Sequence, residues 1–219
     1  MKKALIIVGL FIGINATAQI STNSTNNNSG SSSQSAIGLQ TTASGVASTA
    51  MGRQTLASGD YSTAMGHLTT ASGESSTAMG RSSSATELYA TAMGHQTTAS
   101  GNTSTATGYQ TTASGSASTA MGKETTAGGD NSIAMGYLTS ASGGSSIAMG
   151  RSTSASELYA TAMGHETSAS GNSSTAIGYQ TTASGDYSTA LGYLTVASGG
   201  SALAMGRSSS ATELYATAM

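Results

Sequence analysis

Every histidine, and every basic residue after position 3, occupies one recurring position in this sequence. The position directly follows a glycine and returns every 14 residues, with tyrosines and one leucine at the remaining sites. In chain order it holds Leu39, Arg53, His67, Arg81, His95, Tyr109, Lys123, Tyr137, Arg151, His165, Tyr179, Tyr193 and Arg207. Such a column of cations and aromatic rings could bind an extended protein or a glycan. A solvated edge that keeps the protein soluble is an equally open interpretation, and Glu124 and Glu166 reduce the positive field beside Lys123 and His165.

Other chemistry finds little support in these residues. His67 and His95 are two repeats apart, roughly 10 Å at the usual spacing of strands, and no third ligand column accompanies them. A Ser-His-Asp set can be drawn from Asp60, His67 and any serine, but no nucleophile-elbow sequence supports it. There are no cysteines for thiolate sites. We therefore expect no catalytic residues, no metal, no cofactor and no enzyme activity.

The glycine before this column sets a strict period. It recurs at 38, 52, 66, 80, 94, 108, 122, 136, 150, 164, 178, 192 and 206, and a second glycine divides most of these units into halves of seven residues. A coiled coil is excluded because glycine in a helix costs about 1 kcal/mol relative to alanine. The pattern instead predicts one strand of about five residues, a glycine turn, a second strand and a second turn. Thirteen such coils, stacked in parallel at about 4.8 Å, make a rod roughly 60 Å long.

The composition is consistent with this solenoid only because the residues are ordered in columns. Glycine, serine, threonine and alanine dominate, 7% of residues are charged, and the chain has one Phe and no Trp. Without order this mixture would indicate disorder. The absence of proline leaves every residue a backbone donor for a strand ladder.

The columns also predict which residues share a face. The position of Ala50 is alanine in every unit, whereas its neighbours Thr49 and Met51 belong to columns of Thr, Ile, Leu and Met. Alternation along a strand places Thr49 and Met51 on one face and Ala50 on the other. Both faces are small or apolar, and one coil has only one interior, so we expect a neighbouring chain on the second face. A monomer with one smooth apolar face remains the alternative. The residues assigned to core or trimer packing are Ala50, Met51, Ala134, Met135, Ala148 and Met149.

The N-terminal residues indicate export. Lys2 and Lys3 precede an apolar run from 4 to 14 and a small-residue cleavage site at 16–18, the pattern of a secretory signal peptide over residues 1–18. Residues 19–34 form an Asn/Ser-rich segment without period, typical of a flexible leader. Removal of the two lysines leaves 5 basic against 9 acidic side chains, a net charge of about −4. Nucleic acid is therefore an improbable partner.

At Asn131–Gly136 the sequence reads NSIAMG, and related strings at 146–150 and 174–178 read SIAMG and STAIG. Together with TSASG at 139–143, they resemble the head repeat of trimeric autotransporter adhesins, the YadA-like head, which is approximately NSVAIG-x-x-S-x-A-x-G-x-x. The resemblance covers residues 35–219. It implies an all-β fold, a left-handed parallel β-roll that forms a homotrimer on the bacterial cell surface and outer membrane. The implied partners are extracellular matrix protein, a glycan or another cell-surface ligand, and the membrane would be reached only through a C-terminal anchor beyond residue 219. The chain is expected to be a truncated product.

Several units depart from that pattern. Most have Thr in place of Val and lack the leading Asn, and Thr107 stands in the Met column. Three units replace the second glycine by Glu87, Glu157 or Glu213, each followed by Leu-Tyr. We expect a reshaped turn with an exposed aromatic there, although neutral drift in a duplicated block would give the same sequences.

Two functions are compatible with these features. The first is a surface adhesin head that binds matrix proteins, glycans, other cells or its own kind. The second is an ice-binding or structural surface solenoid, suggested by Thr/Ser columns through Thr42 and Thr55. Leu56 and Val196 interrupt the first of these columns, which favours the adhesin.

Overall fold

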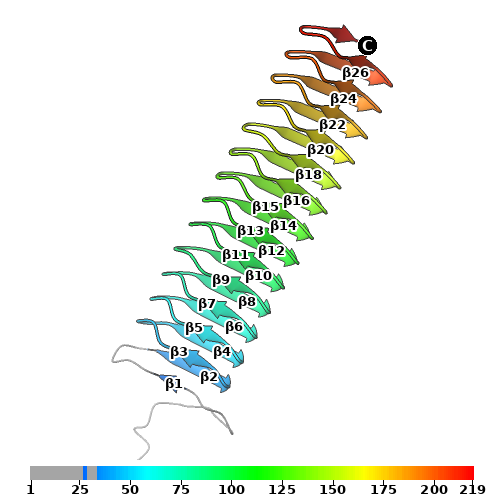
Figure 1. Cartoon of the computed structure of the whole chain (residues 1–219). Helices are drawn as coiled ribbons and strands as arrows, with labels where there is room; N and C mark the ends of the chain where they lie inside the picture. Colours follow the sequence, from blue (N-terminus) through cyan, green and yellow to red (C-terminus); the bar gives the residue numbers. More distant parts are fainter. Residues whose placement is uncertain (1–26, 29–33) are drawn as a thin grey trace, which may run out of the picture.

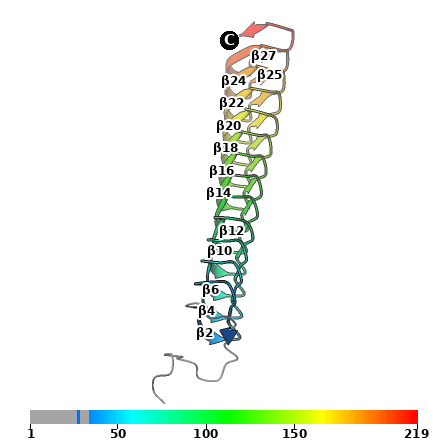
Figure 2. The ribbon, with the colours of Figure 1, turned by 90° about the vertical axis from the view of Figure 1, so that its left-hand side faces the viewer.

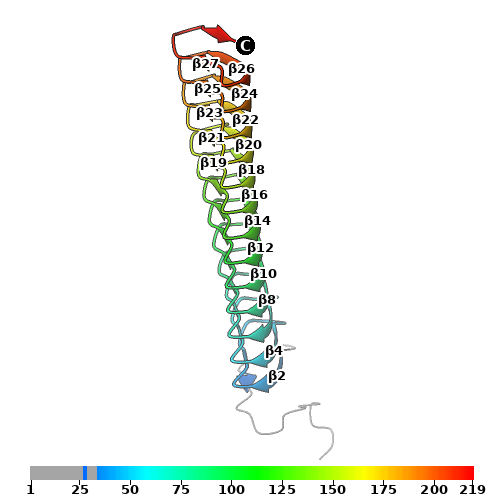
Figure 3. The same cartoon turned by 90° about the vertical axis from the view of Figure 1, so that its right-hand side faces the viewer.

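The computed structural model describes residues 27–28 and 34–219 of the chain. The segment assigned to a signal peptide (1–18) and most of the leader (19–34) lie outside the described residues. From residue 34 onward the chain winds into a straight rod of stacked coils (Figure 1). The turned views show each coil lying directly on the one before it (Figures 2 and 3).

Each coil contributes one five-residue strand to a long-strand sheet. These strands carry Thr-Ala-Met-Gly, or a variant of it such as Ile-Ala-Met-Gly, and the residue that follows it. Their bounds are β2 (Ser35–Leu39), β4 (Thr49–Arg53), β6 (Thr63–His67), β8 (Thr77–Arg81), β10 (Thr91–His95), β12 (Thr105–Tyr109), β14 (Thr119–Lys123), β16 (Ile133–Tyr137), β18 (Ile147–Arg151), β20 (Thr161–His165), β22 (Thr175–Tyr179), β24 (Thr189–Tyr193) and β26 (Leu203–Arg207), with the shorter β28 (Thr217–Ala218) at the end.

A second, short-strand sheet is built from pairs of residues on the opposite side of each coil. The bounds are β1 (Asn27–Asn28), β3 (Thr42–Ala43), β5 (Leu56–Ala57), β7 (Thr70–Ala71), β9 (Ser84–Ala85), β11 (Thr98–Ala99), β13 (Thr112–Ala113), β15 (Thr126–Ala127), β17 (Ser140–Ala141), β19 (Ser154–Ala155), β21 (Ser168–Ala169), β23 (Thr182–Ala183), β25 (Val196–Ala197) and β27 (Ser210–Ala211). β1 comes from the Asn-rich leader and pairs with β3.

Both sheets are parallel, and each strand pairs with its counterpart 14 residues away. In β4 and β6, for example, Ala50 lies opposite Ala64 and Met51 opposite Met65. Identical columns therefore stack along the rod axis, and the predicted all-β parallel solenoid of 14-residue coils is confirmed. Among the described residues no helix is long and apolar enough to cross a membrane.

The recurring glycine is required by the close approach of successive coils. Gly136 has φ of 127°, in the region that favours glycine, and a Cβ added there would overlap the carbonyl oxygen of Gly150. The same conflict recurs at the equivalent glycines of β2 through β24. An insertion or deletion in one unit would move this glycine out of line, which explains the strict period.

The interior of the roll contains only small side chains. Four columns, represented by Thr41, Ala43, Ser48 and Ala50, line it with exposed fractions of 0%. Threonine is the largest side chain that is fully buried, and the described part of the chain has no pocket. Since the Ala50 column points inward, the face of Thr49 and Met51 is the outer one. The structure thus decides which of the two faces considered above remains free for a partner.

Two corners of every coil place a residue other than glycine in the left-handed region. One corner column begins at Gln40 and the other at Ala47, with φ between 49° and 59°. Their amides bind the preceding coil: Tyr61 N donates to Val46 O at 2.7 Å, and Gln54 N donates to Leu39 O at 2.8 Å. These bonds hold a conformation that is otherwise unfavourable for residues with a Cβ.

The units that contain Glu87, Glu157 or Glu213 keep this corner. Tyr89 has φ of 57°, compared with 58° for Tyr61 in a unit with the glycine, and β8 and β10 keep the usual five-residue length. The expected reshaping of the turn backbone is therefore wrong, because the corner is fixed by its bonds to the adjacent coil. The expected exposed aromatic is confirmed, since Tyr89, Tyr159 and Tyr215 are 55%, 59% and 74% exposed.

We predict that Ala134→Leu destabilises the roll far more than Ser142→Leu. Ala134 lies in the interior, where overpacking costs about 1–3 kcal/mol. Ser142 directly follows the short strand β17 and is exposed. The denaturation midpoint and light scattering of both variants measure the difference. Equal midpoints would show that the interior accommodates the larger side chain.

A second prediction concerns the strained corner at Thr103, a β-branched residue with φ of 55°. Thr103→Asn should raise the unfolding free energy by on the order of 1 kcal/mol, because asparagine tolerates this conformation. The matched control is Thr105→Asn in β12, where the extended backbone favours threonine and the change should destabilise. A lower denaturation midpoint for Thr103→Asn would contradict the argument.

Candidate functional site

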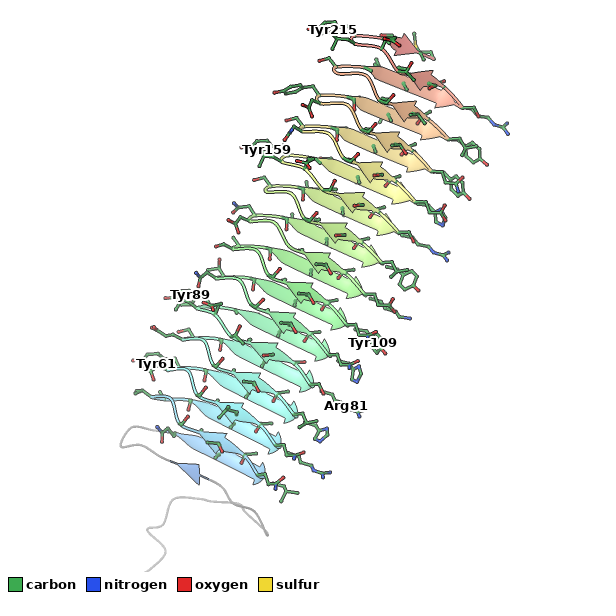
Figure 4. All side chains as sticks on the ribbon, viewed as in Figure 1. Tyr61, Arg81, Tyr89, Tyr109, Tyr159 and Tyr215 are labelled. Carbon is green, nitrogen blue, oxygen red and sulfur yellow. The ribbon has the colours of Figure 1, made fainter. Side chains whose placement is uncertain are left out.

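The residue after each recurring glycine ends a long strand and projects from one edge of the rod. We call these thirteen residues, Leu39 to Arg207, the tip column. Strand pairing places them in register, so that Lys123 of β14 lies between Tyr109 of β12 and Tyr137 of β16. None of the thirteen is buried, and Figure 4 shows the labelled Arg81 and Tyr109 pointing outward at this edge.

The aromatic rings of the tip column stack on one another. The ring centroids of Tyr179 and Tyr193 are 5.1 Å apart with an interplanar angle of 9°. His165 stacks on Tyr179 at 4.9 Å and 6°, and His95 stacks on Tyr109 at 5.1 Å and 17°. In these two parts of the column the rings therefore form stacked surfaces, not separate side chains.

Cations lie over the rings between the stacked pairs. Lys123 Nζ is 5.6 Å from the centroid of Tyr109 and 5.2 Å from that of Tyr137. The guanidinium of Arg151 is 5.9 Å from the Tyr137 ring, and that of Arg207 is 5.4 Å from the Tyr193 ring. These cation–π contacts stabilise Lys123, Arg151 and Arg207 at the edge of the rod, where their side chains remain exposed.

Two glutamates partly neutralise the column, as the sequence suggested. Lys123 Nζ is 3.5 Å from Glu124 Oε1, and His165 Nδ1 is 3.8 Å from Glu166 Oε1. Gln180 Nε2 donates to the other carboxylate oxygen of Glu166 at 2.6 Å. Both acids occupy the left-handed corner directly after the tip column.

The opposite edge of the rod is acidic and carries exposed tyrosines. We call it the turn edge, which comprises residues 45–47 and their equivalents in every coil. Figure 4 shows the labelled Tyr61, Tyr89, Tyr159 and Tyr215 there, on the side away from Arg81. Its acidic residues are Asp60, Glu74, Glu87, Asp130, Glu157, Asp186 and Glu213, and Tyr187 is a fifth exposed tyrosine.

The three turn-edge aspartates also fasten one coil to the next. Asp60 Oδ1 accepts a hydrogen bond from Val46 N at 2.8 Å, and Asp130 Oδ1 accepts one from Ser116 N at 2.8 Å. Asp186 Oδ1 does the same for Asn172 N at 2.9 Å. The turn edge thus contains both structural carboxylates and exposed glutamates whose side chains make no hydrogen bond or ion pair with other described residues.

A third surface is the outer face of the long-strand sheet. Met51, Met135 and Met149 lie there half-buried, with Thr49 and its counterparts beside them. The more exposed members of the same column include Met93, Met121, Ile177 and Met205, at 37–39%. The face runs the length of the rod, and the tip column forms its margin, because residues two apart in a strand point the same way.

These columns belong to a known repeat. A profile described as the YadA head domain repeat, two copies per match, matches residues 35–55, 57–83, 85–111, 113–139, 141–167, 169–195 and 197–219. The chain belongs to the YadA head family. No curated protein matches the chain. Membership identifies an adhesin-type surface protein, and the resemblance of Asn131–Gly136 to the head motif is confirmed.

The geometry explains one element of the YadA head motif. Its leading Asn falls on the second left-handed corner, where Asn131 has φ of 56°. Asparagine adopts this conformation more readily than most residues, so the Asn of the motif lies at a corner whose backbone is left-handed. In the other coils of this chain Ala, Ser, Thr or Tyr occupies the corner.

The structure also places the residues that the sequence offered for catalysis, metal binding, ice binding and packing. Asp60 lies on the turn edge and His67 on the tip column, so the Ser-His-Asp set is not assembled. Among the described residues no cluster of His, Asp and Glu is arranged to hold a metal. The Thr55 column, one of the two considered for ice binding, lies in the interior, where Thr55 is 2% exposed. Ala50, Ala134 and Ala148 are likewise interior, at 0%.

Sequence reasoning identified the tip column but not the turn edge. The signal for the turn edge was present, because acids recur six or seven residues after the basic positions, but they are divided between two columns. The exposed Tyr61 and Tyr187 were missed for a related reason: they share the column of Ala47 with small residues.

Proposed function

We propose that this chain is the head of a trimeric bacterial surface adhesin and that its tip column is the attachment surface. The observation that carries the proposal is the uninterrupted stack of rings and cations from His95 to Arg151 on a YadA head roll. Extended matrix proteins and glycans offer the carboxylates, sulfates and apolar faces that such a stack recognises. Family membership supports export to the cell surface, consistent with the signal peptide assigned to residues 1–18.

Assembly is the first part of this proposal. The outer face of the long-strand sheet is the apolar surface best suited to contact other copies, because contiguous exposed apolar patches mark interaction sites. Three parallel rolls joined on this face would cover the Met51 column and leave the short-strand sheet in water. The head would then present three tip columns along its length.

We predict that Met135→Glu combined with Met149→Glu abolishes the trimer and leaves the β-structure of each roll intact. Each carboxylate would be desolvated at the proposed contact. The matched control is Ser142→Glu with Ser156→Glu, two exposed positions on the short-strand side. Sedimentation velocity reads the mass, and far-UV circular dichroism reads the fold. Equal masses for the two double variants would remove this face from the assembly.

Attachment is the second part. Changing Arg53, Arg81, Lys123, Arg151 and Arg207 together to Gln should weaken binding to immobilised matrix protein by about tenfold or more, since exposed ionic contacts contribute up to about 1 kcal/mol each. Folding stability should change little, because these side chains lie at the surface. A trimeric coiled coil fused after Met219 keeps the number of binding sites constant.

A salt series completes this test. Wild-type attachment should fall between 0.1 M and 1 M salt, as the Debye length shrinks from about 10 Å to about 3 Å. A merely solubilising column predicts unchanged attachment and stronger self-association of the variant. Retained, salt-insensitive attachment by the variant would refute the tip column as the binding surface and direct attention to Tyr89, Tyr159 and Tyr215.

A further inference from the structure

The tyrosines of this chain are distributed unevenly along the rod. All nine lie within residues 34–219, on the tip column or on the turn edge. Tyr179 of β22 and Tyr193 of β24 are the only two that occupy the same column in adjacent coils. Every other tyrosine is separated from the next one in its column by at least one coil without a tyrosine. The chain thus places two phenols side by side at one point of the rod.

The two phenols are close together and accessible. Their ring centroids are 5.1 Å apart, the interplanar angle is 9°, and Tyr179 and Tyr193 are 39% and 42% exposed. Along the column His165 stacks on Tyr179 at 4.9 Å, and the guanidinium of Arg207 lies 5.4 Å from the centroid of Tyr193. Each phenol therefore has the other as its one tyrosine neighbour, with a histidine and an arginine at the two ends of the pair.

The composition makes these phenols a target for one-electron oxidants. The chain has no cysteine and no tryptophan, the other side chains that lose an electron as readily as tyrosine. The methionines of the strands react by a different path, because a thioether takes up an oxygen atom in a two-electron step to form the sulfoxide. They also lie on the outer face of the long-strand sheet. A one-electron oxidant that meets the rod acts on its tyrosines.

We propose that Tyr179 and Tyr193 form an oxidative coupling site, at which a haem peroxidase with hydrogen peroxide joins the two phenols as dityrosine. Each phenol loses one electron and one proton to become a phenoxyl radical, and a carbon ortho to each oxygen then forms the new carbon–carbon bond. The hydrogen on each joined carbon moves to the oxygen of its own ring. The two electrons and two protons reduce one hydrogen peroxide to two waters, so the product is lighter by two hydrogen atoms.

The fold favours coupling within one chain over coupling between chains. Strand pairing holds the two residues in register at the spacing of parallel strands, about 4.8 Å, so the phenols do not have to meet by diffusion. Reacting groups held in this way act at an effective concentration far above that of protein molecules in dilute solution. Exposed side chains change rotamer within picoseconds to nanoseconds, which lets the stacked rings turn until the ortho carbons meet.

The link would join two coils that otherwise depend on their backbone ladders. It connects residues 14 apart in the sequence, and a covalent connection stabilises a fold by restricting the unfolded chain. The five basic residues of the tip column take no part in the coupling, and the proposed trimer leaves the tip column in water. Coupling therefore does not depend on attachment, and its failure would leave the proposed function unchanged.

Peroxidase treatment of the full chain tests the site. At low protein concentration, dityrosine fluorescence should appear, and peptide mapping should place the loss of two hydrogen atoms at Tyr179 and Tyr193 in about tenfold excess over any other pair. Tyr193→Phe removes one phenol and keeps the ring, and should lower the dityrosine yield about tenfold for the same reason. The matched control is Tyr137→Phe, a tip-column tyrosine between Lys123 and Arg151, which should leave the yield unchanged.

A second variant moves the chemistry to a new place. Lys123→Tyr puts a phenol in register with Tyr109 and Tyr137 of the adjacent strands and should create new coupling there. Its control is Ala117→Tyr, which adds a tyrosine in the column of Tyr61 with Thr103 and Asn131 in the adjacent coils, and should add none. New coupling in the control variant equal to that of Lys123→Tyr would show that adjacency in the column does not decide the reaction.

The remaining outcomes are decisive as well. Coupling mainly between chains on a denaturing gel, or mainly through turn-edge tyrosines, would overturn the site. So would absence of dityrosine in the folded chain when free tyrosine in the same solution is coupled. The coupled chain should also have a higher denaturation midpoint than the untreated chain, whereas Tyr193→Phe treated in the same way should show no increase. Equal midpoints would refute the stabilising effect of the link.

Discussion

Successive coils of this protein lie so close that no side-chain carbon fits between them at the end of each long strand. The parallel backbone ladder sets the approach, and the overlap predicted for a Cβ at Gly136 with the carbonyl of Gly150 recurs along the rod. Since this constraint recurs at the same position in successive coils, every coil must have the same length and register. The identical stacking of the other columns, from the buried alanines to the tip column, follows from this close approach, which the second glycine column repeats on the turn edge, for example at Gly129 against Gly143.

The close approach also determines where stability comes from. An interior of alanine, serine and threonine buries little apolar area per residue, so the roll depends on its backbone ladders and on the bonds that hold its corners. Ala90 and Ala160 replace serine in one interior column without altering the strands, which indicates that this hydroxyl is not required there. Larger apolar residues such as Met135 are accommodated only on the outside, and a surface suited to assembly results from the narrow interior.

The functional surfaces of this protein are formed by the side chains at the outward-facing positions of the repeat. A repeat that fixes the backbone leaves the outward positions free to vary, and this chain uses that freedom unevenly: cations and rings at one edge, acids and tyrosines at the other. Side chains at the same position of successive coils contact one another and so form a continuous surface, as in the run from His95 through Lys123 to Arg151. Weak exposed contacts repeated at a common pitch add along the rod, which suits both attachment and lateral association.

The sequence by itself determined the period, the parallel solenoid, the five-residue strand and the alternation that puts Met51 opposite in direction to Ala50. It did so because each of these follows from local rules: glycine at a fixed interval and side chains alternating along a strand. Only the tertiary structure decided which face is interior, that Thr55 is buried whereas Thr42 is at the surface, and that Tyr89 keeps an ordinary corner. The turn edge likewise emerged only in three dimensions. Its acids occupy two different columns of the repeat, and the fold of each coil, not their spacing in the sequence, brings them to one edge opposite the cations.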